Sequence, residues 1–462
     1  MLKSSNFGII RVKKIESTEN EIMKLTIKRM GNDGEGIGFY ENKPVYIYYA
    51  FLNEEVIVDV FTNKRGVFEG VLKEVVTPSE HRIDVSWPYY MESGSVNLLH
   101  LNYLEALNYK KYVIKRLVEK RLPGKIVINN TLPSEKIYHY RNKTDLPVIY
   151  QDGKNYMANY YRGSNKLFKV EKLIVEEEVL EKTILEVLSL MDKHNINAFN
   201  FKNRKGSVVS LSLRTNLKGE IQLTFITKEK VNLNNLINEL VLNNKNIVSV
   251  YENFVPKFKT NIDIYNGKLE LIKGSKYLEI ELDKYKFYVT PFSFFQLNTA
   301  QANKLYQYIL KNVSFNKNET VLEAFSGIGT IATFISQLVK QVVAIESIKD
   351  SINDMKYSLD KNKITNVKPI VGDAFKVIET LNNKFDKMIF DPPRGGLGKE
   401  LCETIIKMKP KTIVYVSCNP LTLVDDLKIL TKAYKIKTIT PLDMFPQTSH
   451  VETITLLSLK TA

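Results

Sequence analysis

Cysteine is scarce in this sequence. Only two of the 462 residues, Cys402 and Cys418, are cysteines. Two thiols cannot build a disulfide framework or a four-thiolate metal site, and their scarcity suits a reducing compartment. No apolar run approaches the roughly 20 residues that a membrane-spanning helix needs, and the N-terminal stretch has no apolar core of signal-peptide length. We therefore expect a cytoplasmic protein with no membrane partner, and we expect a monomer.

Acidic residues are outnumbered by basic ones. The formal net charge is +15 and the pI is about 9.3, and the chain also contains 25 Tyr and 22 Phe. A positive surface attracts polyanions, and aromatic rings supply stacking surfaces for bases. The composition favours nucleic acid as the partner. The alternative is that an AT-rich coding sequence alone enriched the chain in lysine, asparagine and isoleucine.

The pattern of the chain changes twice. From residue 23 to about residue 82, short β-rich runs alternate with turn signals, which predicts a small antiparallel barrel or sandwich. Residues 100–121 change to helical spacing and predict one basic amphipathic helix. The apolar positions of this helix are Leu101, Leu104, Leu107, Tyr112, Ile114 and Leu117. Residues 122–290 mix strand-like pieces with a helical run near 176–192, which indicates an α+β region.

Strands and helices alternate regularly in the last third. This order predicts a mostly parallel, doubly wound sheet with helices on both faces, so the fold class is α/β. In such sheets, ligands bind beyond the carboxyl ends of the strands.

The first strand of this sheet is followed by Gly327 and Gly329, which allow a tight turn and a close ligand approach. The second strand ends at Glu346, where an acid can accept hydrogen bonds from ribose hydroxyls. The dinucleotide fingerprint lacks its third glycine, and no P-loop lysine follows, so S-adenosylmethionine is the remaining nucleoside cofactor. A simple strand-to-helix turn is the alternative.

The fourth strand ends at Asp391-Pro392-Pro393-Arg394. Two prolines cannot continue a central strand, so they force a rigid exit that holds Asp391 at the ligand edge. The alternative is a plain loop with Arg394 on the surface.

The fifth strand delivers Cys418 to the same edge. Asn419 is a candidate N-cap and Pro420 suits the first helical turn, so the helix dipole should favour the thiolate of Cys418. A structural cysteine is the alternative, and it describes Cys402 well. Further along, His450 and Glu452 lead into the final strand, beside the fifth; a solvated or capping role is their alternative.

Several motifs, taken in order, carry a family resemblance. They are PFSFFQLN, SGIGT, AIES, DPPRGGL, VSCNPLTL and MFPQTSHVET. Together they resemble the S-adenosylmethionine-dependent RNA uracil-C5 methyltransferases, which make 5-methyluridine in tRNA and ribosomal RNA. The segment containing GNDGEGIGF resembles the TRAM domain, an OB-like RNA-binding barrel of the ribosomal RNA branch.

The resemblance implies three domains and a set of site residues. The domains are a TRAM domain at 18–77, a central α+β RNA-recognition domain at 78–285, and a class I (Rossmann-like) methyltransferase domain at 286–462. Cys418 is implied as the nucleophile and Glu452 as the base. The implied cofactor-binding residues are Gln296, Phe325, Glu346 and Asp391, and Asp373 is a further candidate for contacting the adenine.

The chemistry of these residue types agrees with that resemblance. Carbon C5 of uracil is too electron-poor to take up a methyl group unaided, so a thiolate first adds to C6. A base then removes the C5 proton and the thiolate leaves. The target nucleotide must be flipped out of folded RNA, and basic and aromatic surfaces must offset that cost.

The sequence departs from the family at its iron-sulfur cysteines. Residues 87–96, WPYYMESGSV, contain none of the three expected there, and Leu173 stands near the fourth position. We expect no iron-sulfur cluster. The frame of that motif survives in Pro88, Gly94 and residues 97–100, which favours the ribosomal RNA branch. Glu323 and Ser326 stand where Asp and Cys are usual.

The sequence thus predicts a methyltransferase acting on C5 of a uridine in 23S ribosomal RNA. The T-loop of tRNA is the nearest alternative substrate. An amino-group methyltransferase is disfavoured because residues 391–394 replace its Asn-Pro-Pro-aromatic signature. A non-catalytic RNA-binding assembly factor is disfavoured because each proposed catalytic position holds a competent residue.

Overall fold

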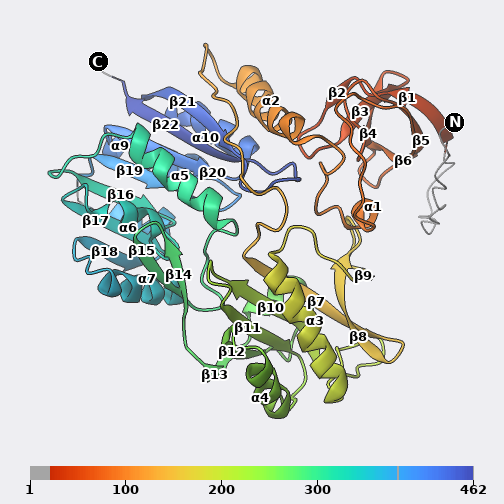
Figure 1. Ribbon diagram of the computed structural model, residues 1–462. Helices are drawn as coiled ribbons and strands as arrows, with labels where there is room; N and C mark the ends of the chain where they lie inside the picture. Colours follow the sequence, from red (N-terminus) through yellow and green to blue (C-terminus); the bar gives the residue numbers. More distant parts are fainter. Residues whose placement is uncertain (1–20, 382–383, 461–462) are drawn as a thin grey trace. The chain divides into compact units, whose positions relative to one another are not determined.

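The computed structural model describes residues 21–381 and 384–460 (Figure 1). This part of the chain divides into two compact units. The first takes in the described residues as far as Asp84, together with His100–Asn102, and the second takes in Val85–Leu99 and the described residues from Tyr103 onward. None of the helices in the described ranges is both long and apolar enough to cross a bilayer.

The first unit is a six-stranded sheet in the order β1-β5-β6-β4-β3-β2. Its strands are β1 (Glu21–Thr26), β2 (Arg29–Met30), β3 (Gly36–Tyr40), β4 (Lys43–Ile47), β5 (Glu55–Thr62) and β6 (Phe68–Thr77). Alternate residues of β5 are buried, as expected for a strand with one face on the core. The predicted antiparallel pairing is wrong for β4 and β6, which are parallel. The intervening strand β5 runs antiparallel to β6 and lets the chain return in the direction of β4.

The second unit begins with α1 (Tyr90–Ser93) and α2 (Tyr103–Arg121). Helix α2 is the basic helix predicted at 100–121, but its buried face differs from the expected one. Leu104 is 69% exposed and Tyr112 is 39% exposed, whereas the side chain of Lys110 is only 1% exposed. Lys110 can lie on the buried face, although it is charged, because it has an acidic partner in the interior.

A seven-stranded sheet follows, in the order β13-β12-β11-β10-β7-β8-β9. Its strands are β7 (Lys143–Gln151), β8 (Lys154–Tyr160), β9 (Leu167–Val170), β10 (Val208–Thr215), β11 (Ile221–Thr227), β12 (Ile247–Phe254) and β13 (Lys268–Gly274). Helices α3 (Glu178–Lys193) and α4 (Asn234–Asn243) pack with one apolar face of this sheet. The opposite face is polar: Arg214 pairs in register with Lys143 on one side and with Gln222 on the other. Residues 122–290 are therefore α+β, as predicted.

The last part of the chain contains the predicted doubly wound sheet, in the order β18-β17-β16-β19-β20-β22-β21 (teal to blue in Figure 1). Five strands are parallel, and β22 pairs antiparallel with both β20 and β21. The strands are β16 (Thr320–Ala324), β17 (Gln341–Glu346), β18 (Val367–Val371), β19 (Lys387–Phe390), β20 (Thr412–Ser417), β21 (Tyr434–Leu442) and β22 (Glu452–Leu459).

The helices of this part alternate with its strands. They are α5 (Thr299–Asn312), α6 (Thr330–Ser336), α7 (Lys349–Lys361), α8 (Ala374–Thr380), α9 (Gly398–Met408) and α10 (Pro420–Leu430). The hairpin of β14 (Leu278–Leu282) and β15 (Tyr285–Val289), preceded by the 3-10 turn η1 (Asn261–Tyr265), connects the two large sheets along the chain. All four residues of β19 are buried, as are nearly all of those in β16, β17 and β20. Because these strands are parallel and buried, their carboxyl ends lie along one edge of the sheet. The first polar residues of the connecting loops lie at that edge.

Candidate active site

Asp391 follows β19 directly, at the predicted edge. Gln296 Nε2 lies 3.5 Å from Asp391 Oδ2, so the sheet and the segment before α5 meet there. Burial raises the pKa of Asp391 to about 7, because taking a carboxylate out of water disfavours its charged form. Near neutral pH this group can therefore both hold and release a proton.

Cys418 lies one residue beyond β20 and is half-buried. The predicted cap is present: Asn419 Oδ1 accepts from the backbone N–H of Leu421 at 3.1 Å, and Pro420 begins α10. The predicted lowering of the thiol pKa is nevertheless wrong. Burial, assisted by the charges of Glu452 and Asp391, raises the pKa of Cys418 to about 11, and Arg394 only partly opposes them. Desolvation and two nearby carboxylates outweigh one helix end.

Glu452 begins β22 and is 3% exposed. The β20–β22 pairing runs as far as Ser417 opposite Thr453, which brings Glu452 to the same edge as Cys418. Burial, and next the charge of Asp391, raises the pKa of Glu452 well above its usual value. Its Oε1 has no hydrogen-bond partner among the described residues. This oxygen is therefore available to accept a hydrogen bond from a ligand or a water molecule.

The turn after β16 is strained in a way that suits a ligand site. Phe325 has a φ of 62°, although it is not glycine, and Gly327 and Gly329 also have positive φ. The backbone N–H of Gly327 donates to Glu346 Oε2 at 3.0 Å, and that of Ile348 donates to Oε1 at 2.8 Å. Glu346 is thereby held at the end of β17, beside the glycine turn, as predicted from their spacing.

Asp373 has a defined local role. Its Oδ1 accepts from the backbone N–H of Phe375 at 3.1 Å, which caps α8. The ring of Phe375 packs edge-to-face with that of Phe325, with centroids 5.4 Å apart. An aromatic surface therefore lies beside the turn after β16.

Two buried groups of the site were missed from the sequence. Burial raises the pKa of Glu323 to about 8, and its Oε2 accepts from the backbone N–H of Ala332 at 2.7 Å. The hydroxyl of Tyr306 accepts from Thr330 Oγ1 at 2.9 Å, and burial raises its pKa, with Asp391 among the smaller causes. Only Glu323 gave a signal, as an acid within an otherwise apolar strand.

Arg394 and His450 face each other at the exposed side of the site. The guanidinium Nη2 of Arg394 lies 3.2 Å from His450 Nδ1. The backbone carbonyl of Arg394 accepts from Asn419 Nδ2 at 2.8 Å and from Thr422 Oγ1 at 3.2 Å. These bonds tie the loop after β19 to the residues that follow Cys418.

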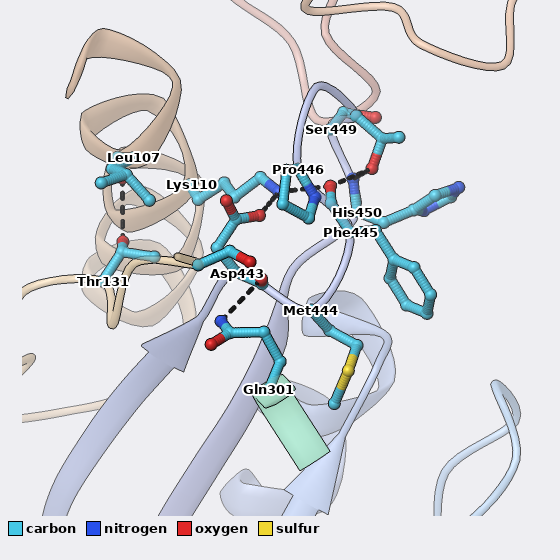
Figure 2. A network of polar contacts seen from close by, with 12 residues as sticks. Leu107, Lys110, Thr131, Gln301, Asp443, Met444, Phe445, Pro446, Ser449 and His450 are labelled. Carbon is cyan, nitrogen blue, oxygen red and sulfur yellow. Dashed lines mark hydrogen bonds and ion pairs between the residues drawn. The ribbon is translucent and has the colours of Figure 1, made fainter. Parts of the chain in front are cut away.

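The turn 443–450, which leads into Glu452, is held from two sides, and Figure 2 shows the side that faces Lys110. On one side, Lys110 pairs with the carboxylate of Asp443 and donates to the carbonyl of Phe445 at 3.0 Å. On the other, Asn97 Nδ2 donates to Ser449 Oγ at 3.0 Å and Asn97 Oδ1 accepts from the backbone N–H of Ser449 at 2.8 Å. In Figure 2 the rings of Phe445 and His450 project from the turn on the side away from Lys110.

The segment that carries Gln296 is held by the central sheet. Asn142 Nδ2 donates to the carbonyl of Gln296 at 2.9 Å and lies 2.8 Å from Thr299 Oγ1. Arg214 Nη2 donates to the carbonyl of Ser293 at 2.7 Å. The polar face of one sheet thus fixes the backbone of a site segment that belongs to the other.

Residues 87–96, where the resemblance places the family's cysteine motif, are bonded directly to residues 162–172. The indole N–H of Trp87 donates to the carbonyl of Lys172 at 3.0 Å, and the hydroxyl of Tyr89 accepts from the backbone N–H of Glu171 at 3.0 Å. The backbone N–H of Arg162 donates to the carbonyl of Glu92 at 2.8 Å. Direct hydrogen bonds therefore connect the two segments.

This sheet order, with acids at the ends of β17 and β19, defines an α/β fold of the methyltransferase class. The model of the tRNA (Uracil-5-)-methyltransferase family matches residues 102–460. An uncharacterized RNA methyltransferase of Clostridium tetani is 34% identical over 96% of this chain and 98% of its own, and one of Lactobacillus johnsonii is 32% identical over 94% and 96%. The chain belongs to the S-adenosylmethionine-dependent RNA uracil-C5 methyltransferase family.

A solved structure resembles nearly the whole chain. It is the Pyrococcus abyssi tRNA (uracil-54, C5)-methyltransferase in complex with S-adenosyl-L-homocysteine, at a TM-score of 0.76 and 25% identity. The likeness covers 94% of this chain and 99% of that one. It therefore extends beyond the methyltransferase sheet.

The residues at the strand ends fit S-adenosylmethionine. Glu346 offers a carboxylate for ribose hydroxyls, and the rings of Phe325 and Phe375 offer an apolar surface for a base. Asp391 and Glu323 are buried acids with raised pKa values, and a positively charged ligand beside them would favour their ionised forms. Gln296 lies beside Asp391 at the same edge.

Proposed function

We propose that this chain methylates C5 of a uridine in 23S ribosomal RNA through a covalent bond between Cys418 and C6 of the base. The observation that carries the chemistry is the pairing of β20 with β22, which brings a half-buried thiol to one edge of the sheet together with a buried carboxyl oxygen that has no partner within residues 21–381 and 384–460. A thiol beside a carboxyl is the pair needed to add to a ring and later restore it.

Each residue then has a defined task. Cys418 loses its thiol proton to solvent, and its sulfur bonds to C6 as the C5–C6 double bond opens, which makes C5 a carbon nucleophile. When bound, S-adenosylmethionine supplies the methyl group that C5 takes up. Glu452 removes the proton from C5, the C6–S bond breaks, and the ring double bond returns. The thiolate leaves with its electron pair, so the protein is restored.

The proton balance of the site agrees with this order. Glu452 and Asp391 cannot both be ionised easily, since each raises the cost of charging the other. Both pKa values are raised, so the site resists carrying two negative charges at once, and Glu452 serves as the base only in its ionised form. Arg394 is the positive group that favours the thiolate of Cys418 for the first step.

The choice of ribosomal RNA rests on the N-terminal resemblance and on the surviving cysteine-motif frame. Asn97, part of that frame, holds the turn that leads to Glu452, which gives the frame a use without a metal. The T-loop of tRNA is the second candidate. It is favoured by the likeness to the Pyrococcus abyssi enzyme, because that tRNA enzyme matches 94% of this chain, including part of the N-terminal unit.

The test uses the two cysteines as variant and control. Cys418→Ala should abolish 5-methyluridine formation and the trapping of RNA that contains 5-fluorouridine. Cys402→Ala removes the other, fully buried thiol and should retain both activities. An active Cys418→Ala variant would refute the covalent route. Assaying 23S and tRNA transcripts side by side, with mass spectrometry of the products, separates the two substrates; methylation of tRNA alone overturns the ribosomal assignment.

A further inference from the structure

The second unit contains a large cavity that the proposed chemistry does not use. Its volume is about 1110 Å³, above the roughly 300–1,000 Å³ typical of sites for single small molecules. One wall comes from β7, β8 and the loops around them, and another comes from the loop at 199–202. The cavity also reaches Phe445, Thr448 and His450, the turn that leads to Glu452.

Aromatic rings line the cavity and are available to a ligand. Phe201 is 52% exposed, and its other side is supported by the rings of Phe199, at 5.0 Å, and Phe258, at 6.0 Å between centroids. Tyr265, 44% exposed, is fixed by its hydroxyl, which donates to Asp145 at 2.7 Å. Exposed rings held rigidly from behind are what stacking of unpaired bases requires.

The charges at the cavity favour a polyanion. Its basic lining residues are Arg141, Lys166 and Lys202. The lining also includes Asp145 and Glu176. Asp145 is compensated within the protein by Lys143, 3.5 Å away, and by the hydroxyls of Ser212 and Tyr265. The groups left for a ligand are therefore mainly cationic.

The cavity adjoins the reaction site at one residue. His450 lines the cavity, and its Nδ1 lies 3.2 Å from Arg394, the group that favours the thiolate of Cys418. Glu452 is only two residues further along the chain. A strand that delivers a base to Cys418 and Glu452 would thus continue past His450 into the cavity.

We propose that this cavity binds the unpaired nucleotides that adjoin the target uridine. Their bases stack on Phe201 and Tyr265, and their phosphates contact Arg141, Lys166 and Lys202. This subsite deepens the proposed function, on which it rests, and it gives the central sheet the task of recognising single-stranded RNA beside the flipped base. A cavity larger than one small-molecule site, with supported rings and net positive lining, fits such a segment.

The first test replaces the ring. Phe201→Ala should weaken the binding of a synthetic RNA that carries the unmodified target uridine. The expected loss is between about 5- and 150-fold, the usual loss for one stacked base. Phe201→Trp should restore binding, and Phe201→Leu should not, although both keep an apolar side chain against Phe199. Leu217→Ala, at a 71% exposed apolar residue outside the cavity, is the matched control and should bind as the wild type does.

The second test measures how RNA affinity depends on salt when two lysines of the cavity are neutralised. The double variant Lys166→Gln/Lys202→Gln should reduce the slope of log affinity against log salt by about 1.4, since each contact to single-stranded RNA contributes about 0.7. The control is Lys230→Gln/Lys245→Gln, which changes two exposed lysines that do not line the cavity. S-adenosylmethionine binding, measured by calorimetry, should be unchanged in both double variants.

The third test locates the bound nucleotides. RNAs with a single abasic position at each site flanking the uridine are titrated against wild type and Phe201→Ala. At the stacked position, the two changes should cost no more together than either alone. Additive losses at every flanking position, or wild-type affinity in Phe201→Ala, would overturn the subsite. Failure of the proposed function looks different: the wild-type chain would then form no 5-methyluridine, whatever the cavity variants do.

Discussion

The ammonium of Lys110 is paired with the carboxylate of Asp443 in the interior of the second unit, and each side chain is 1% exposed. Tyr103 donates its hydroxyl to the same carboxylate at 2.7 Å. Gln301 Nε2 donates to the backbone carbonyl of Asp443 at 2.8 Å (Figure 2). The pair therefore joins α2 and α5 to the turn before Glu452.

Removing one partner of this pair should be costly. Asp443→Asn would leave the charge of Lys110 buried beside neutral groups, which should lower the free energy of unfolding by about 3–5 kcal/mol. Lys110→Met/Asp443→Asn should recover much of that loss, because no unpaired charge remains. Urea unfolding followed by the fluorescence of Trp87, the single tryptophan, reports on this unit. The control is Lys115→Met, at an exposed ion pair worth about 0–1 kcal/mol; an equal loss there would contradict the role of the buried pair.

A second prediction concerns stability and pH. Burial raises the pKa of Glu323 from 4.5 to about 8, so the folded state binds more protons than the unfolded state between these values. The contribution of the protonated Glu323 to the free energy of unfolding is full below about pH 4.5. This contribution is lost as the pH rises through 8. Glu323→Gln should therefore flatten the fall in thermal unfolding temperature between pH 5 and 9, and should be more stable than wild type at pH 9.

The matched control for this experiment is Glu119→Gln, at an exposed acid of α2. Its pH profile should follow that of the wild type. Asp391, with a pKa raised to about 7, remains in all three proteins, so some slope should persist in each. An unchanged slope in Glu323→Gln would show that this carboxyl titrates normally when folded.

The sequence predicted positions at strand ends better than it predicted their environment. Asp391, Cys418 and Glu346 could be placed because buried runs ended there in a regular strand-helix alternation. The raised pKa of Cys418 could not be predicted, because it depends on burial and on two carboxyls supplied by other strands. A cap and a helix end are local signals, whereas desolvation is set by the whole fold.

The buried lysine illustrates a second limit. Helix α2 contains several lysines at similar spacing, and nothing local distinguishes Lys110 from Lys115. Only the partner 333 residues further along decides which one is buried. The contacts of the polar face of the central sheet could not be predicted either. Asn142 and Arg214 donate to carbonyls in a segment about 80 to 150 residues away.

Asn142 should act as a positioning residue for Gln296. Asn142→Ala removes the amide that donates to the Gln296 carbonyl, so the segment beside Asp391 should shift. A displacement of about 1 Å near reacting groups can cost about 100-fold, and we expect kcat/KM to fall by about 10- to 100-fold. RNA affinity by filter binding should stay near the wild-type value, because the change lies outside the cavity lining.

Two variants sharpen that test. Asn142→Asp keeps the shape but replaces the donating amide by a carboxylate, and should be as impaired as Asn142→Ala. Asn312→Ala removes an exposed amide that donates to the Tyr308 carbonyl, and should have normal kinetics. Loss of RNA affinity with unchanged turnover on saturating RNA would instead assign Asn142 to RNA binding.

The ionisation of the Cys418 thiol can be measured directly by alkylation, and it reports on the charges around the site. With its pKa raised to about 11, its alkylation by iodoacetamide in the RNA-free protein should accelerate about tenfold per pH unit from pH 7 to pH 10, because the thiolate is the reacting form. Glu452→Gln removes a charge that raises this pKa, so alkylation at pH 9 should become faster. Arg394→Met removes the opposing charge, so alkylation should become slower. Mass spectrometry of the Cys418 peptide gives the rates, with the buried Cys402 as internal reference. A rate that levels off by pH 8 would mean that the thiol is already ionised near neutral pH, and Arg394 would then outweigh the two carboxyls.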